Sequence, residues 1–335
     1  MCCHRGRPFP LRLRFHRSRK QVGGRYPQRH QGRENRAKQN HQTLRSPHPD
    51  LDHLSIKCFA KINLFLKVLG ERPDGYHEVC TLLQTIDLHD ELTLSKRPRG
   101  ITVKSSSEAI PLGEENLAYR AVKLLERECQ TPLGVELSID KRIPVSAGLG
   151  GGSSDAAGTL LGMNELYSLG LSKKRLQQMS SQLGSDVPFF FSGGQALATG
   201  RGEKIREISL PRNYFLVLVS PSFGVSSEWA YEKAKKDLTT AVEFDLILEW
   251  NAVDRIEEII PFLENDLEAG VISEFGEIGR LKGVLSRKGA LLAQMSGSGS
   301  AVYGIFDREA LAEEVASSMS GEVREIFVTR PVLLH

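Results

Sequence analysis

The stretch of sequence that decides the fold is rich in glycine. It runs Pro144-Val145-Ser146-Ala147-Gly148-Leu149-Gly150-Gly151-Gly152-Ser153-Ser154. Four glycines lie within five positions, between a predicted strand and a stretch of small residues that predicts a buried helix over 155–167. Glycine permits positive φ angles and close backbone approach, so amides of the loop and helix start can converge on one anion, which the helix dipole also favours. The stretch predicts a phosphate-binding loop.

This loop belongs to neither of the two commoner phosphate-loop classes. A Walker loop would continue with Gly-Lys-Ser or Gly-Lys-Thr, and no such sequence follows. A protein-kinase glycine loop would be followed by H-R-D and D-F-G, and both are missing from the downstream sequence. Taken alone, the stretch could also be a flexible turn.

Two charged residues stand in apolar surroundings. Lys61 lies in the predicted strand 56–69, and a lysine inside an apolar strand is costly to bury unless it is paired or used. Asp186 lies at a predicted turn before Pro188 and three aromatic residues, where a carboxylate can be oriented as a general base. Read singly, Lys61 could face solvent and Asp186 could close an Asx-turn.

Two further segments invite a functional interpretation. In the turn 73–77, Tyr76 and His77 together offer a stacking face and a polar edge, which suit a nucleobase. The alternating glycines and serines of 296–300 lie between two predicted strands, where they allow backbone to approach backbone or a ligand. A structural turn and a plain hairpin loop are the respective alternatives.

Composition narrows the class of protein. Residues 1–50 carry 13 Lys/Arg and 2 Asp/Glu, whereas residues 51–335 carry 31 Lys/Arg and 39 Asp/Glu. The body of the chain therefore has a net charge of −8. This acidity disfavours an extended nucleic-acid surface. No apolar run approaches the ~20 residues of a membrane helix. Five cysteines without metal spacing indicate free thiols in a reducing compartment.

The basic leader, residues 1–54, has little apolar periodicity, and we expect it to be disordered. Three interpretations stay open: a nucleic-acid-binding arm, an organelle transit peptide, or an extension upstream of the true start. We expect a cytoplasmic protein, or a plastid one if the leader is a transit peptide.

Periodicity predicts strands and helices in mixed order, which favours an α+β fold over a regular parallel one. Predicted strands cover 56–69, 79–88, 91–94, 101–104, 135–139, 196–199, 214–219, 290–294, 301–306 and 324–329. Predicted helices cover 116–129, 155–167, 171–183, 226–236, 244–250, 254–263, 276–286 and 308–319.

In this order, the motifs resemble those of the GHMP kinase superfamily. The resemblance runs from about residue 55 to near the C-terminus and rests on A-K-I-N-L-F-L with R-P-D-G-Y-H, on P-V-S-A-G-L-G-G-G-S-S-D-A-A and on S-G-S-G-S. The segments L-G-S-D-V-P-F-F and N-D-L-E are also similar to family segments. The resemblance implies two α+β lobes: a ribosomal S5 domain 2-like, ATP-binding lobe over 55–210 and a ferredoxin-like lobe over 211–335.

The resemblance also implies an activity. It implies ATP and Mg²⁺ as cofactors, and K-I-N-L with D-G-Y-H points to phosphorylation of the 2-hydroxyl of 4-diphosphocytidyl-2-C-methyl-D-erythritol in non-mevalonate isoprenoid synthesis. The superfamily's mevalonate, homoserine and galactose kinases and diphosphomevalonate decarboxylase are alternatives that residues 74–77 disfavour. A monomer or weak homodimer without nucleic-acid or membrane partners is expected.

The same resemblance assigns roles to residues. Lys61 and Asp186 match the catalytic pair, and residues 144–154 match the ATP loop. Asn63, Tyr76 and His77 match residues around the cytidine diphosphate substrate. Tyr231 falls, by a looser alignment, where the family places an aromatic ring on the cytosine. No metal-ligating residue is predicted.

Overall fold

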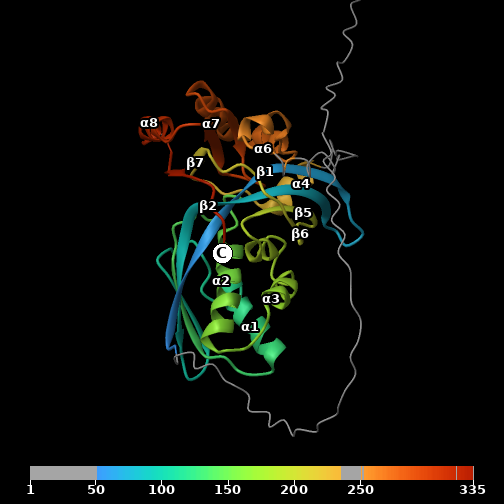
Figure 1. Ribbon diagram of the computed structural model, residues 1–335, viewed down its shortest axis with the longest axis vertical. Coiled ribbons are helices and arrows are strands. Elements are labelled where there is room, and N and C mark those ends of the chain that lie inside the picture. Colours follow the sequence, from blue (N-terminus) through green and yellow to red (C-terminus); the bar gives the residue numbers. More distant parts are fainter. Residues whose placement is uncertain (1–50, 235–249, 251–252, 322, 335) are drawn as a thin grey trace, which may run out of the picture. The chain divides into compact units, whose positions relative to one another are not determined.

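The computed structural model describes residues 51–234, 250, 253–321 and 323–334, and these form two lobes, each built on one sheet (Figure 1). The predicted leader therefore lies outside the described residues except for 51–54, and so does the helix predicted at 244–250, except for its last residue. In the first sheet the strands follow the order 101–105, 135–140, 77–96, 195–200 and 204–207, and strand 53–71 pairs with 77–96. In the second the order is 325–329, 215–220, 302–306 and 292–295.

The first lobe contains six strands and the helices packed on them. Its strands are β1 (His53–Glu71), β2 (His77–Lys96), β3 (Ile101–Ser105), β4 (Val135–Asp140), β5 (Gln195–Gly200) and β6 (Lys204–Glu207). Its helices are α1 (Leu117–Cys129), α2 (Gly151–Leu166), α3 (Lys173–Ser180) and the 3₁₀ helix η1 (Val187–Phe191).

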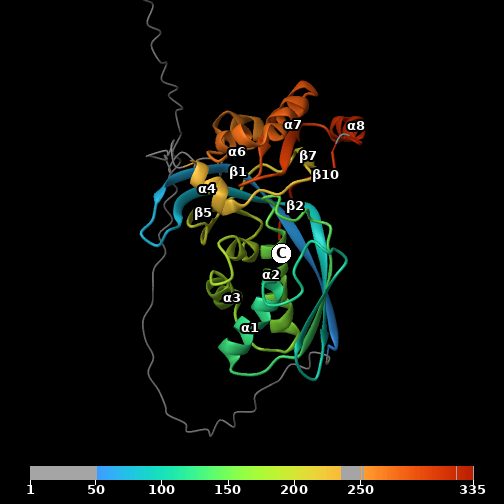
Figure 2. The ribbon, with the colours of Figure 1, turned by 180° about the vertical axis from the view of Figure 1, so that it is seen from behind.

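The long hairpin of β1 and β2 reaches from the first lobe into the second (Figures 1 and 2). The prediction of two separate strands at 79–88 and 91–94 was wrong, because β2 continues through the polar residues between them. Asp90 is fully buried there, and its carboxylate is paired with the ammonium of Lys141. A paired charge can therefore lie inside a strand that its sequence seems to interrupt.

Helix α2 lies very close to the first sheet. A Cβ atom at Gly158 would lie 2.5 Å from Sγ of Cys58, and one at Gly162 would lie 2.8 Å from a methyl group of Leu94. These two glycines allow the close packing. The helix begins at Gly151, four residues before the predicted start, so the last glycines of the loop form its first turn.

The second lobe follows a short connection after β6. Its elements are β7 (Phe215–Ser220), α4 (Ser227–Ala234), η3 (Ile256–Glu258), η4 (Ile260–Phe262), α6 (Glu268–Glu274), α7 (Gly276–Arg287), β8 (Leu292–Met295), β9 (Val302–Phe306), α8 (Glu309–Met319) and β10 (Glu325–Thr329). The single helix predicted at 254–263 was wrong: two 3₁₀ turns stand there, and Pro261 lies in the second. Strand β6 and helix α6 were not predicted.

Strand β7 has cores on both faces. Leu216 and Leu218 join a core that contains Ile62 of β1, whereas Val217 and Val219 join the core formed with α7 and α8. The second sheet is therefore sandwiched between the long hairpin and its own helices. The long hairpin of β1 and β2 contributes to both lobes. The division into domains 55–210 and 211–335 therefore stays a prediction.

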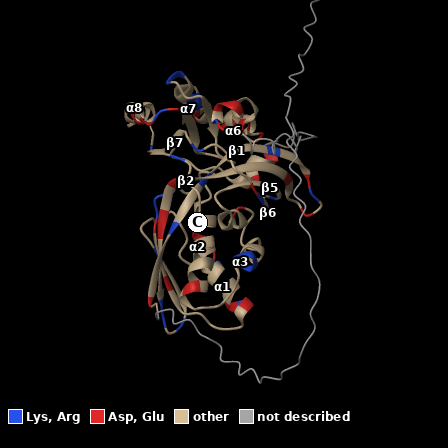
Figure 3. Cartoon of the chain, in the orientation of Figure 1, with Lys and Arg blue, Asp and Glu red and all other residues tan. Residues whose placement is uncertain are grey.

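Basic and acidic residues occur in both lobes (Figure 3). None of the described helices is long and apolar enough to cross a membrane.

Candidate active site

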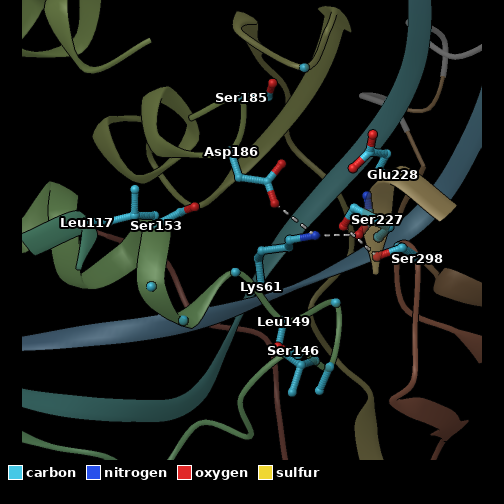
Figure 4. Close-up of a pocket in the computed structure, with 18 of the residues that line it drawn as sticks. Lys61, Leu117, Ser146, Leu149, Ser153, Ser185, Asp186, Ser227, Glu228 and Ser298 are labelled. Atoms are coloured by element: carbon cyan, nitrogen blue, oxygen red, sulfur yellow. Dashed lines mark hydrogen bonds and ion pairs between the residues drawn. The ribbon is translucent and has the colours of Figure 1, made fainter. Parts of the chain in front are cut away.

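A cavity of about 920 Å³ lies where the glycine loop, β1, the turn after β5 and helix α4 meet (Figure 4). Its walls include most of the residues singled out from the sequence. Those are Lys61, Asn63, Tyr76, His77, Asp186, Tyr231 and the loop residues Pro144 to Ser153. Ser154, in contrast, is buried in the first turn of α2 and is not part of the cavity wall.

Lys61 and Asp186 form an ion pair in this cavity, although 125 positions separate them in the sequence. Nζ of Lys61 lies 3.2 Å from Oδ2 of Asp186 (Figure 4). The lysine side chain is only 4% exposed, whereas that of Asp186 is 35% exposed. The ammonium is thus fixed inside the protein, while the carboxylate remains open to a ligand.

Asn63 orients the lysine. Its Oδ1 accepts a hydrogen bond of 2.6 Å from Nζ of Lys61, and its Nδ2 donates to Oγ1 of Thr81 at 2.8 Å. Thr81 in turn donates to the carbonyl oxygen of Phe65 at 2.7 Å. This chain of hydrogen bonds fixes both Asn63 and the ammonium before any ligand binds.

The glycine loop passes directly over Lys61. The backbone amide of Lys61 donates to the carbonyl oxygen of Leu149 at 2.9 Å. Gly148 and Gly150 have φ angles of 75° and 69°, and a Cβ at Gly148 would lie 2.0 Å from the carbonyl oxygen of Ser296. Only glycine fits there, because the loop is wedged against the segment 296–300.

The alternating glycines and serines of 296–300 hold the loop from the other lobe. Oγ of Ser296 donates to the carbonyl oxygen of Gly148 at 3.0 Å, and Ala301 donates its amide to Ala147 at 3.1 Å. Asn265 donates to the carbonyl oxygens of Met295 and Gly297 at 2.9 and 2.8 Å. The N-D-L-E segment thus supports the closing loop, which supports the glycine loop.

Aromatic side chains gather at the end of the cavity beyond Asp186. The rings of His77 and Tyr231 stack with centroids 5.3 Å apart and planes inclined by 21°. Burial, together with the nearby charge of Asp186, raises the pKa of the Tyr231 hydroxyl. Tyr76 is 51% exposed at the rim. These rings offer flat surfaces to a planar ligand beside the carboxylate.

A buried charge cluster lies under the start of α2. Nζ of Lys141 contacts Asp90 and lies 3.1 Å from Oδ2 of Asp155, and all three side chains are almost fully buried. Burial raises the pKa of Asp155 to about 7, although the charge of Lys141 opposes this shift. The cluster ties β2 to the helix whose first residues line the cavity.

Comparison with known proteins decides the family. The GHMP kinases N terminal domain matches residues 116–194, and the GHMP kinases C terminal domain matches residues 244–325. Over 283 residues the chain is 40% identical to the 4-diphosphocytidyl-2-C-methyl-D-erythritol kinase of Acetivibrio thermocellus, spanning 84% of this chain and 100% of that relative. This chain belongs to the GHMP kinase family.

Further relatives agree with this assignment. A 4-diphosphocytidyl-2-C-methyl-D-erythritol kinase of a Synechococcus species is 42% identical over 80% of this chain and 89% of its own length. A crystal structure of 4-(cytidine 5'-diphospho)-2C-methyl-D-erythritol kinase superposes with a TM-score of 0.70 and 32% identity, over 83% of this chain and 99% of that chain. A mevalonate kinase structure, 17% identical with a TM-score of 0.60, shares the fold. The two-lobed α+β fold is confirmed.

Sequence reasoning missed several residues of this GHMP kinase's cavity. Ile110, Pro111 and Leu117 form an apolar wall at one end, and Asn116 caps α1 by accepting from the amide of Ala118 at 2.8 Å. The N-cap of helix 116–129 was a sequence signal that could have directed attention to this wall. Lys141 and Arg201 resemble ordinary surface charges in the sequence.

Proposed function

We propose that this GHMP kinase transfers the γ-phosphoryl group of ATP to the 2-hydroxyl of 4-diphosphocytidyl-2-C-methyl-D-erythritol. The observation that carries the proposal is the Lys61–Asp186 ion pair, which lies between the glycine loop and the His77–Tyr231 stack. Relatives of about 40% identity, named for this acceptor, support its identity.

Asp186 acts as the base in this proposal. Its partly exposed carboxylate takes the proton of the attacking hydroxyl while that oxygen bonds to the γ-phosphorus. The bond from the γ-phosphorus to the bridging oxygen breaks, and ADP leaves with the electron pair. Lys61, fixed by Asn63, stabilises the negative charge that develops between the two oxygens.

The glycine loop and the first turn of α2 would hold the phosphates of ATP. Their residues line the cavity, and the positive end of the helix dipole favours anions there. The close approach of Gly148 to Ser296 leaves no room for a side chain at that position, so the backbone of the loop is held in one place. The apolar wall of Ile110, Leu117 and Val145 suits the adenine ring.

The polar groups of the cavity suit Mg²⁺ that is held mainly by phosphates. The described residues contain no cluster of three or more His, Cys, Asp or Glu side chains that could hold a metal ion. Mg²⁺ commonly keeps several waters and binds through substrate phosphates and one or two carboxylates. When bound, it would neutralise charge on the transferred group; Asp186 is the reacting-centre carboxylate near which it would lie.

The aromatic end of the cavity would hold the cytosine of the acceptor. We assign the cytosine to the rings of Tyr76, His77 and Tyr231, which line this end of the cavity. Asn63 would position the polyol through its place beside Lys61.

Release of ADP in a coupled assay tests this function. The full chain and a chain that begins at residue 51 should both turn over 4-diphosphocytidyl-2-C-methyl-D-erythritol, and neither should turn over mevalonate or homoserine. Residue 51 is preferable to 55 as a start, because Lys96 donates its amide to the carbonyl oxygen of Asp52 at 2.9 Å. Turnover of mevalonate or homoserine alone would overturn the acceptor assignment.

A further inference from the structure

Arg201 lies at the rim of the cavity, in the turn that follows β5. The turn is closed by the amide of Gly202, which donates to Thr199 at 3.1 Å, and by the amide of Arg201, which donates to Oε2 of Glu203 at 2.6 Å. The guanidinium lies over the ring of Tyr76, with Cζ 4.6 Å from the ring centroid. The backbone of the arginine is thus fixed while its side chain rests on an exposed aromatic ring.

The charge of Arg201 is not neutralised as the other cavity cations are. Among the described residues, Lys61, Lys141 and Arg201 are the cationic side chains of the cavity wall. Lys61 pairs with Asp186, and Lys141 pairs with two buried aspartates. Within the described part of the chain, Arg201 forms no ion pair. Asp74 lies close enough for its charge to interact with that of Arg201, but its carboxylate is paired with Arg72.

The turn of Arg201 also lies beside the reacting carboxylate. A Cβ atom on Gly202 would lie 3.6 Å from Cβ of Ser185 and 4.0 Å from Oδ1 of Asp186. Arg201 therefore stands between the aromatic end of the cavity and Asp186. Consider an acceptor whose base stacks on the aromatic rings and whose hydroxyl lies at Asp186. The group that joins its base to its hydroxyl must then lie beside Arg201.

We propose that Arg201 binds the diphosphate of the acceptor and selects for it, an inference that rests on the proposed function. In the proposed acceptor the diphosphate is the group that joins cytidine to the polyol. A guanidinium presents several N–H donors in a fixed plane and binds phosphate oxygens in pairs. The ring of Tyr76 holds this plane at the cavity rim before the acceptor arrives.

A purely structural role for Arg201 predicts a different pattern of binding. If the arginine only supports Tyr76, its loss should weaken every ligand that stacks on that ring, with or without phosphate. If it binds the diphosphate, its loss should weaken only ligands that carry phosphate. Cytidine, CMP and CDP differ only in their phosphate groups, so their binding separates the two roles.

Calorimetric titration of the full chain with cytidine, CMP and CDP tests the proposal. Arg201→Met should raise the Kd of CDP by about 10- to 100-fold, the range for a lost charge-assisted hydrogen bond, and leave that of cytidine unchanged. Arg201→Lys should fall between this variant and the unaltered chain. Arg206→Met, at an exposed position of β6, is the matched control and should change nothing.

Turnover and folding supply the second readout. Arg201→Met should raise the KM of the acceptor with little change in the KM of ATP, and its thermal unfolding should match that of the control. An equal loss for cytidine and CDP, or unchanged CDP binding in Arg201→Met, would overturn the proposal. If the unaltered chain binds no CDP, the proposed function fails and this inference with it.

Discussion

At the scale of single residues, Asp186 is the side chain on which the proposed phosphoryl transfer depends most directly. It is held by one ion pair and is open to a ligand, whereas Lys61 is enclosed. Asp186→Asn keeps the shape of the side chain but removes the proposed proton acceptor, so we expect kcat to fall by about 10²- to 10⁴-fold. Coupled ADP release would measure kcat, and calorimetry should show an ATP Kd within about threefold of the unaltered value, a difference that corresponds to roughly 0.7 kcal/mol.

Asp254→Asn, at an exposed position remote from the cavity wall, is the control for this substitution. Near-full turnover by Asp186→Asn with normal ATP binding would show that another group removes the proton.

Ser146 illustrates strain at a single position of the glycine loop. Its φ angle is 57°, in the left-handed region where a side chain costs about 1–2 kcal/mol relative to glycine. Ser146→Gly should therefore raise the free energy of unfolding by about 1 kcal/mol, because the glycine's extra freedom when unfolded offsets part of the gain. Urea unfolding would measure it. Ser138→Gly, at an exposed position of β4 without positive φ, should lower it instead.

At the scale of elements, the sequence predicted most helices and strands but misjudged those that polar groups shape. The periodicity of 116–129 predicted α1 with only its first residue misplaced, because a local amphipathic pattern is enough to mark a helix of this kind. The break assumed near Asp90 was wrong because its partner, Lys141, lies 51 residues away. A pairing at that separation leaves no local signal. Strand β6 is short, mostly exposed and lies at a sheet edge, so no apolar pattern marks it.

The Asp90–Lys141–Asp155 cluster makes the attachment of α2 to β2 dependent on pH. Burial raises the pKa of Asp155 to about 7 in the folded protein, from an ordinary value of 3.8 for an aspartate in water. The folded state therefore binds this proton more tightly than the unfolded state, and stability is lost as the pH rises from about 4 to 7. Asp155→Asn removes this loss, so its melting temperature relative to the unaltered chain should rise across that range.

Thermal unfolding at pH 5 and pH 8 would measure the difference, with the exposed Asp140→Asn as the control. Each kcal/mol corresponds to a shift of about 2–4 °C for a chain of this size class. A melting difference that stays constant between the two pH values would show that Asp155 is not protonated in the folded chain.

At the scale of the whole molecule, the candidate site joins segments from both lobes. The sequence predicted Lys61, Asp186 and the glycine loop, because each stands in a local pattern that a polar or backbone function explains. It did not predict that Ser296 of the second lobe braces the loop, since that hydrogen bond joins residues 148 positions apart. Nor did it predict that Asn265 supports the segment of Ser296 through hydrogen bonds to residues 30 and 32 positions away. The order of the site therefore depends on how tightly the two lobes are joined.

The C-terminal segment is a further connection between the lobes, besides the long hairpin and the hydrogen bonds of segment 296–300. The amide of Val332 donates to Thr85 of β2 at 3.0 Å, Oγ1 of Thr85 donates back to Val332 at 2.7 Å, and Leu334 donates to Gly193 at 3.1 Å. A chain that ends at Arg330 loses these bonds and uncovers Gln84, whose Nε2 donates to Val332 at 3.2 Å. At about 1 kcal/mol for each bond, we expect it to be less stable by about 2–4 kcal/mol.

Urea unfolding of chains that end at Arg330 and at Leu333 would measure this contribution. The longer chain keeps the bonds of Val332 and should lose only about 1 kcal/mol, the share of the Leu334 bond. Because the segment lies outside the cavity wall, both chains should keep kcat at low temperature. Equal stability of the two chains would show that the return of the C-terminus to β2 does not help to hold the lobes together.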